Sequence, residues 1–374
     1  MNKFKIPVNE TLLKGNEKKY LNKCIDDNFI SSSGPFVEKF EKNFAKKVKR
    51  KYAIAVSNGT AAIQIAFDSL NIKKGDQIIL PSFTIISCVL PIIRGGAIPV
   101  LIDSDPITWN MDVTKIEKKI TKKTKAIIAP HIYGLPVDMD PLLKIAKKYK
   151  LKVIEDAAEM IGQKYKNKIC GSFGDVSTFS FYANKHITTG EGGMIATNDL
   201  KIANRCRSLR NICFNKERRF LHYELGWNHR FTNIQAAVGL AQLEKLDKFV
   251  IKKRKIGDIY NKELSKIDLI SMPHQRTKFS RNIYWVYGLL VKKKSKISVK
   301  SIMKKLSKQG IETRNFFWPL HQQPVLKKLG LFKNLRLPVS ENLAKNGFYI
   351  PSGLAITKKQ QIYVIKKIKN IFTK

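Results

Sequence analysis

The stretch FSFYANKHITTGEGGM, residues 179–194, joins a strand-like run to a lysine and a glycine-rich loop. An apolar run typical of a buried strand is followed by a single lysine, Lys185, and then by a loop rich in glycine and threonine. A lysine in a partly desolvated site has a lowered pKa and becomes a competent amine nucleophile toward carbonyl compounds. Alone, Lys185 would be an ordinary surface lysine, so its meaning depends on what the fold places beside it.

Strand-like and helix-like segments alternate along the first half of the chain. Short β-branched apolar runs predict strands at 52–57, 76–80, 98–103, 125–130, 152–156, 176–181 and 192–197. Helix-like stretches lie between them, for example at 59–70 and 140–150. This alternation predicts an α/β fold with a mainly parallel sheet covered by helices on both faces. In such sheets, ligands bind beyond the carboxyl ends of the strands.

The pattern changes after residue 230. Thr232 followed by Gln235 predicts a capping box, and it opens one long helical stretch over 233–260. The remainder is typical of a smaller α+β unit, with a strand at 283–291 and helices near 301–310 and 360–372. We therefore expect two domains, a large one over 1–250 and a small one over 251–374.

The chain is strongly basic. It has 70 Lys and Arg against 29 Asp and Glu, a formal net charge of +41. The lysines are spread along the whole chain and no nucleic-acid-binding motif is recognisable, which favours a solvated basic surface with some field for a small anionic substrate over nucleic-acid binding. Five scattered cysteines without a CxxC pair argue against a disulfide framework and against a zinc site, so no metal is expected. With no membrane-spanning run or export signal recognised, a soluble cytoplasmic protein is the expectation.

Two other predicted strand ends carry polar residues suited to a ligand. One is the junction of a strand and a helix, formed by Ser57, Asn58, Gly59 and Thr60. Free N–H groups at a helix N-terminus suit a phosphate, although an ordinary helix cap is the alternative interpretation. The other is Asp156, a carboxylate that is costly to bury unless it meets a cation or a protonated ring.

Together with Lys185, these strand ends suggest one ligand, pyridoxal phosphate. Its phosphate would lie on the 57–60 junction and on Ser180, its ring nitrogen on Asp156, and its aldehyde would form a Schiff base with Lys185. The glycines at 190, 192 and 193 would let the chain turn tightly beneath it.

Longer motifs make the sequence similar to the DegT/DnrJ/EryC1/StrS sugar aminotransferases. They run over essentially the whole chain: SNGTAAIQIA (57–66), GDQIILPSFTIIS (75–87), HIYGLPVDMD (131–140), EDAAEMIGQKY (155–165), GSFGDVSTFSFYANKHITTGEGGM (171–194) and TNIQAAVGLAQLEKLD (232–247). The resemblance implies an aspartate-aminotransferase-like fold (fold type I of pyridoxal-phosphate enzymes). That fold has a large α/β domain with a mainly parallel seven-stranded sheet and a smaller C-terminal α+β domain.

The resemblance also implies residue roles at the cofactor. Lys185 would carry the cofactor and move a proton between a cofactor carbon and a sugar carbon. Asp156 would keep the pyridine nitrogen protonated, and Glu159 would lie near the ring hydroxyl. Ile85 would pack on the ring, where many relatives have an aromatic residue.

For the phosphate, the resemblance implies Ser180 and the Gly59–Thr60 turn from one subunit. Asn228 would reach it from the other subunit, which implies a homodimer with shared active sites. Substrate contacts are expected from Arg219, Arg230, Arg314, Phe317, Trp318 and His321. Interdomain salt bridges and core packing are the alternative roles of these residues.

A narrower likeness is to members that aminate a GDP-linked sugar, carried by LRNICFNKERRFLHYELGWNHRFTNIQAA, NIYWVYGLLV and ETRNFFWPLHQQP. It implies transamination at C4 of GDP-4-keto-6-deoxy-D-mannose with L-glutamate as amino donor. The alternatives are a UDP- or dTDP-linked keto sugar, or a non-catalytic or nucleic-acid-binding protein, which could dispense with Lys185 and Asp156. A related branch that dehydrates such sugars has histidine in place of the lysine. Here the lysine is present, so His186 is expected to pack or to orient a neighbour.

Overall fold

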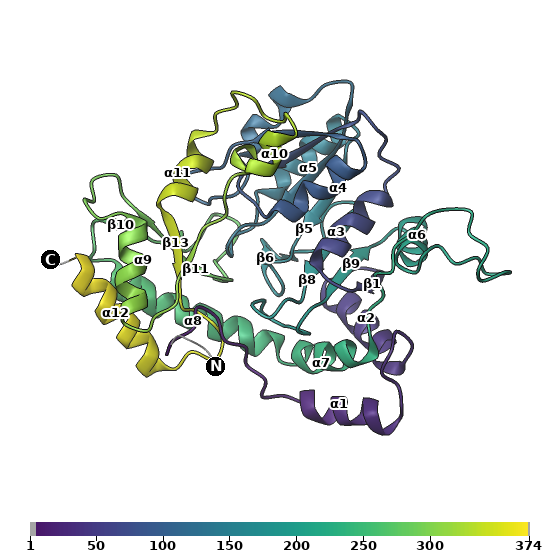
Figure 1. Ribbon diagram of the computed structural model, residues 1–374, viewed down its shortest axis with the longest axis horizontal. Helices are drawn as coiled ribbons and strands as arrows, with labels where there is room; N and C mark the ends of the chain where they lie inside the picture. The colour runs from purple at the N-terminus through teal and green to yellow at the C-terminus, as the bar shows by residue number, and fades with distance from the viewer. Residues whose placement is uncertain (1–4, 373–374) are drawn as a thin grey trace.

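A seven-stranded sheet forms the centre of the computed structural model, which describes residues 5–372 (Figure 1). Its strands are β1 (Tyr52–Val56), β2 (Gln77–Pro81), β3 (Ile98–Ile102), β4 (Thr124–Pro130), β5 (Lys152–Asp156), β8 (Val176–Ser180) and β9 (Gly193–Thr197). Their order across the sheet is β1-β9-β8-β5-β4-β2-β3. Strand β9 runs antiparallel to the other six strands, which are parallel to one another. The predicted mainly parallel sheet is therefore confirmed, with strand ends within one residue of those expected.

Helices cover both faces of this sheet. Successive side chains of each strand point to opposite faces, so apolar side chains on both faces have to be buried. Ala53 and Ala55 face the core shared with α2 (Pro35–Lys47), α5 (Met139–Lys148) and α7 (Asn233–Leu243). Ile54 and Val56 face the core shared with α3 (Gly59–Asp68), α4 (Leu90–Arg94) and α6 (Leu200–Arg210). Helix α1 (Glu17–Asp26) packs on α7.

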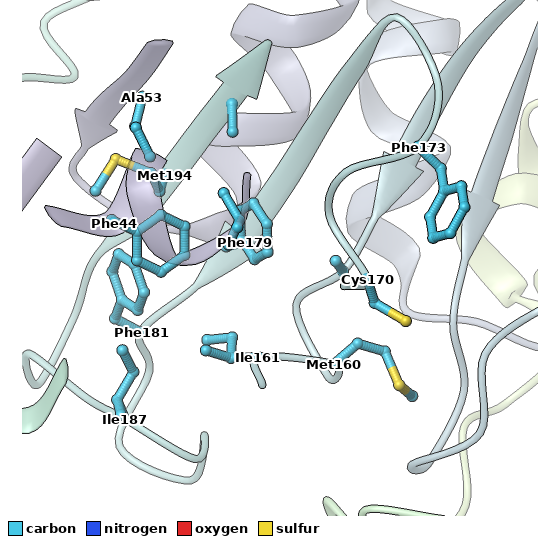
Figure 2. Packing of buried hydrophobic residues seen from close by; sticks show 14 of the residues in the cluster. Phe44, Ala53, Met160, Ile161, Cys170, Phe173, Phe179, Phe181, Ile187 and Met194 are labelled. Carbon is cyan, nitrogen blue, oxygen red and sulfur yellow. The ribbon is translucent and has the colours of Figure 1, made fainter. Parts of the chain in front are cut away.

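Aromatic side chains fill the first of these cores. The ring of Phe44 meets that of Phe179 edge-on at 4.8 Å between centroids and that of Phe181 at 5.3 Å. Figure 2 shows these rings together, with Ile187 and Met194 beside them. Edge-to-face packing of this kind holds β8 and the segment after it firmly in place, and that segment leads to Lys185.

A second, smaller sheet lies to one side, with strand order β10-β11-β13-β12 and all pairs antiparallel (Figure 1). Its strands are β10 (Ile270–Ser271), β11 (Tyr287–Val291), β12 (Arg314–Asn315) and β13 (Gly347–Ile350). Helices α8 (Leu246–Leu264), α9 (Val299–Lys308) and α12 (Lys358–Phe372) supply side chains to its core. The remaining elements are β6 (Lys164–Tyr165), β7 (Lys168–Ile169), α10 (Pro324–Lys328), α11 (Pro338–Asn346), η1 (Ile86–Cys88), η2 (Val113–Lys115), η3 (Glu117–Lys119) and η4 (Leu320–Gln322).

Two details of the second half differ from expectation. The long helical stretch is two helices, α7 and α8, which break at residues 244–245. Strand β11 begins at Tyr287 rather than at residue 283, because the backbone of Tyr284 is left-handed, with φ of 51°. The capping box is confirmed: the Thr232 hydroxyl accepts from the Gln235 N–H at 3.2 Å, and the Gln235 side chain accepts from the Thr232 N–H at 3.0 Å.

Helix α8 contributes to both cores. Its first turns place Phe249 and Val250 in the core of the large sheet, and its later turns place Tyr260 and Leu264 under the small sheet. The expected boundary at 250 would fall inside this helix, and the division into 1–250 and 251–374 stays a prediction. None of the helices over residues 5–372 is long and apolar enough to cross a membrane.

Candidate active site

A cavity of about 680 Å³ lies at the carboxyl ends of the central strands. This is where ligands bind in open α/β sheets. Many of the residues expected at a site line it together, namely Asn58, Gly59, Thr60, Ile85, Asp156, Ser180, Lys185, Arg314 and Phe317. They come from the ends of β1, β2, β5 and β8 and from the second half of the chain.

The start of α3 and Ser180 form one end of this cavity. Asn58 caps the helix, its side chain accepting from the N–H of Ala61 at 2.8 Å. A β-carbon on Gly59 would lie 2.8 Å from that of Ser180, so only glycine lets the serine approach the helix start. The other N–H groups of the first turn have no acceptor within the helix and lie at its positive dipole end. With the Ser180 and Thr60 hydroxyls, these donors fit a phosphate group.

Asp156 lies at the end of β5 and is only 5% exposed. Its Oδ1 accepts from the N–H of Ala158 at 3.1 Å and from Thr178 Oγ1 at 3.3 Å. Cys88 Sγ lies 3.5 Å from its Oδ2. Burial raises the pKa of Asp156, and the Ala158 N–H and the Lys185 ammonium counteract part of that rise. A protonated ring nitrogen supplies a further cation of the kind that a buried carboxylate needs.

Lys185 projects into the same cavity from the segment after β8. Desolvation lowers the pKa of its ammonium, and the carboxylates of Glu159 and Asp156 counteract that effect. Its Nζ lies 3.8 Å from the centroid of the Trp285 ring. A partly desolvated amine of this kind can bind a carbonyl carbon.

Glu159 lines a small adjoining cavity of about 50 Å³ that Ile85 and Lys185 also border. Its Oε2 accepts from the N–H of Tyr133 at 2.6 Å. Burial raises the pKa of Glu159 to about 8, so the carboxyl can hold a proton near neutral pH. A protonated carboxyl can donate a hydrogen bond to an oxygen, which is compatible with the expected position of Glu159 near the cofactor hydroxyl.

Several expected site residues do not line the main cavity. Ser57 lies behind it, where its N–H donates to the carbonyl of His229 at 3.0 Å. Asn228 forms an isolated bridge with Asn211 and is exposed. Arg219 and Arg230 line a different cavity, of about 740 Å³, near the end of α6. For Asn228 and these arginines, contact with a ligand of the same or a partner subunit stays a prediction.

His321 and Trp318 also lie outside the cavity walls. His321 is 2% exposed, with Nδ1 2.7 Å from Ser82 Oγ and Nε2 3.2 Å from Glu341 Oε1. Both ring nitrogens are thus engaged inside the protein, which is the packing role considered for this residue. Trp318 is half exposed and donates through Nε1 to the carbonyl of Gln322 at 3.2 Å.

Other residues that line the cavity were not expected from the sequence. They are Arg94, Tyr182, Asn184, Glu191, Trp227, His229, Trp285 and Tyr349, together with Ala61, Ile63, Gln64, Ser87 and Ala158. Trp285 lies in the apolar stretch NIYWVYGLLV, whose composition is that of a core strand. Only the fold brings its ring to Lys185.

This fold and this site define a pyridoxal-phosphate-dependent aminotransferase. Residues 12–369 match the profile of the DegT/DnrJ/EryC1/StrS aminotransferase family, and the chain belongs to that family. The resemblance and the fold class expected from the sequence are thereby confirmed.

Two curated relatives match along their whole length. The chain is 42% identical over 368 residues to the GDP-perosamine synthase of Escherichia coli O157:H7, covering 98% of this chain and 99% of the relative. It is 38% identical over 367 residues to the GDP-perosamine synthase of Vibrio cholerae, again covering 98% and 99%. One similar solved structure is a mutant GDP-4-keto-6-deoxymannose-3-dehydratase with bound GDP-perosamine. It has a TM-score of 0.89 and 25% identity, covering 97% of this chain and 100% of that one.

Proposed function

We propose that the protein converts GDP-4-keto-6-deoxy-D-mannose to GDP-perosamine, with L-glutamate as the amino donor. The observation that carries this proposal is the convergence of Lys185, Asp156 and the α3 N-terminus on one cavity, in a chain that matches two GDP-perosamine synthases from end to end. The similar dehydratase structure holds GDP-perosamine itself, which supports a GDP-linked sugar as the substrate.

The residues of the cavity have separate roles in the proposed reaction. Bound pyridoxal phosphate supplies an electron sink for the carbon that exchanges its amine. Lys185 Nζ is the amine that can bind the cofactor and take up or return a proton beside it. Asp156 holds a positive charge at the ring nitrogen, and the start of α3 with Ser180 anchors the phosphate.

Cations at the rim suit the anionic substrates. Arg94 and Arg314 line the cavity, and the Arg314 guanidinium has its Nη2 3.2 Å from Glu312 Oε1. Arginine binds carboxylates and phosphates in a planar, bidentate manner. The same rim can therefore receive the carboxylates of glutamate in one half-reaction and the diphosphate of the sugar nucleotide in the other.

A homodimer is part of the proposal, supported by the long loop after α6, residues 211–232. It projects away from the body at the right of Figure 1 and exposes 81% of Phe220, 77% of Tyr223 and 96% of Leu225. Aromatic and aliphatic side chains exposed together mark an interaction surface. Trp227, near the end of the same loop, lines the cavity, so a second copy that covers the loop would lie beside the site.

The test is a stepwise amine transfer. The protein is loaded with pyridoxal phosphate, given glutamate, freed of excess amino acid and then offered the 4-keto-6-deoxy sugars of GDP, UDP or dTDP. We expect mass spectrometry to find an amino sugar only with the GDP sugar, and none from Lys185→Ala. Amino-sugar formation from the UDP or dTDP sugar instead would overturn the substrate, and no transfer with any of them would overturn the proposal.

A further inference from the structure

The amine of Lys185 rests on the face of an aromatic ring. Its Nζ lies 3.8 Å from the centroid of the Trp285 ring, well inside the range of a cation–π interaction. Trp285 is only 5% exposed, so the contact is largely shielded from water. Trp binds a cation more strongly than Tyr or Phe does, and desolvation strengthens the interaction.

Trp285 is fixed in this position from several sides. Its Nε1–H donates to the carbonyl of Asn184, the residue before the lysine, at 3.0 Å. Its own carbonyl accepts from Lys253 Nζ at 2.9 Å, and the same Nζ donates to the carbonyl of Ser352 at 2.6 Å. Lys253 is 3% exposed, and burial lowers its pKa to about 7, so a buried amine of α8 ties the segment before β11 to the segment after β13.

We propose that the Trp285 ring binds the amine of Lys185 while that amine is free, and that Lys253 is a positioning residue for this ring. Whenever Lys185 is not joined to the cofactor, the indole face holds its ammonium at the cavity wall. The amine then stays within reach of the cavity, where the next proton transfer takes place. This inference rests on the proposed function only in taking Lys185 as the reacting amine.

Burial and the ionisable groups around Lys185 determine the pKa of its amine. Burial lowers the pKa of Lys185, and Glu159 and Asp156 counteract this, as Cys88 does to a smaller extent. On the other side stands Lys253, whose Nζ is bound to two carbonyl groups. Because the indole face favours the ammonium over the neutral amine, removing the ring lowers the pKa of Lys185.

The test follows the labelling of Lys185 in the full-length protein without cofactor or substrate. An amine-reactive reagent is applied across a range of pH, and peptide mass spectrometry compares Lys185 with the exposed Lys358 in the same sample. The midpoint of the pH profile reports the pKa, whereas the plateau at high pH reports access of the reagent. A purely structural role of Trp285 would change the plateau and leave the midpoint where it is.

We expect the midpoint to fall in the order wild type, Trp285→Phe, Trp285→Leu. Below the midpoint, Lys185 of Trp285→Leu should be labelled roughly 2- to 30-fold faster after correction for the plateau, because a cation–π contact contributes about 0.5 to 2 kcal/mol. An unchanged or raised midpoint in Trp285→Leu would overturn the proposal. If that variant does not fold, Trp285→Phe decides in the same way.

The role of Lys253 is tested with Lys253→Met, matched by Lys255→Met at an exposed position of the same helix. We expect the first to lower the Lys185 midpoint, because Trp285 loses its anchor, and the second to leave the midpoint as in the wild type. Equal midpoints in the two variants would overturn the positioning role. Because no substrate is used, neither result depends on which sugar nucleotide the enzyme accepts.

Discussion

The carbonyl oxygen of Asn58 lies 2.3 Å from the place that a β-carbon on Gly193 would occupy. Gly193 pairs with Val56 of β1 on one side and with Ser180 of β8 on the other. The missing side chain therefore lets three segments meet at one point, at the end of the cavity that we propose for the phosphate. The glycines after Lys185 serve this close packing as well as the turn.

Gly193→Ala should therefore cost about 3 kcal/mol of unfolding free energy, since a backbone carbonyl must move to admit the methyl group. Gly190→Ala is the matched control. Its φ is 81° and its β-carbon would meet nothing within 4 Å, so it should cost only about 1 kcal/mol of backbone strain. Denaturant unfolding measures both. A Gly193 variant no less stable than the Gly190 variant would contradict this packing.

Asp156→Asn should retain the fold and lose most of the activity. The amide oxygen can still accept from the Ala158 N–H, but it carries no charge for the ring nitrogen. Losing a charge-assisted hydrogen bond of about 1.5 to 3 kcal/mol should lower kcat roughly 10- to 150-fold. Steady-state kinetics, with a thermal melt as the folding control, measures the effect. A fully active Asn variant would rule out the role given to Asp156.

The seven strands of the large sheet could be predicted because each is a short β-branched run between turn residues, a pattern that local sequence determines. The meeting of Asp156, Lys185 and the start of α3 at one cavity could also be predicted, because the carboxyl ends of neighbouring parallel strands meet at one edge of the sheet. The positions of Asp156 and Lys185 could be predicted once their strands were assigned.

The part of the cavity formed by the second half of the chain could be predicted only for Arg314 and Phe317, and only through the family resemblance. Trp285 and Trp227 carry no polar signature in the sequence, and they reach the cavity only through the path of long connections. His321 has a residue type suited to a ligand, yet hydrogen bonds to Ser82 and Glu341 hold it in the interior. The direction of such a side chain depends on tertiary packing, which cannot be predicted from the local sequence.

Acid should destabilise the protein partly through His186. Burial lowers the pKa of this imidazole to about 3, and its Nδ1 has no hydrogen-bond partner among residues 5–372. Between about pH 6.5 and 3 the unfolded state binds a proton that the folded state excludes, so stability falls as the pH falls.

His186→Leu should flatten this slope by up to about 1.4 kcal/mol per pH unit, whereas His274→Leu, at an exposed histidine, should leave it as in the wild type. Denaturant unfolding at a series of pH values is the measurement. Parallel pH profiles for the wild type and His186→Leu would show that this histidine is not buried in its neutral form.

The loop after α6 should control assembly. Leu225→Glu places a charge on a side chain that is 96% exposed in the single chain and that we expect a second copy to cover. Sedimentation should show a dimer for the wild type and dissociation for this variant. Ile362→Glu, on α12 at a position 52% exposed, should remain a dimer. A monomeric wild type would contradict the shared active site.

The most direct test identifies the amine that carries the cofactor. The protein is incubated with pyridoxal phosphate, reduced with borohydride, digested and analysed by mass spectrometry. Lysines are spread along the whole chain, so a label on one lysine alone is informative. We expect the cofactor mass on Lys185 and no labelled peptide from Lys185→Ala. A cofactor fixed on another lysine, or on none, would contradict it.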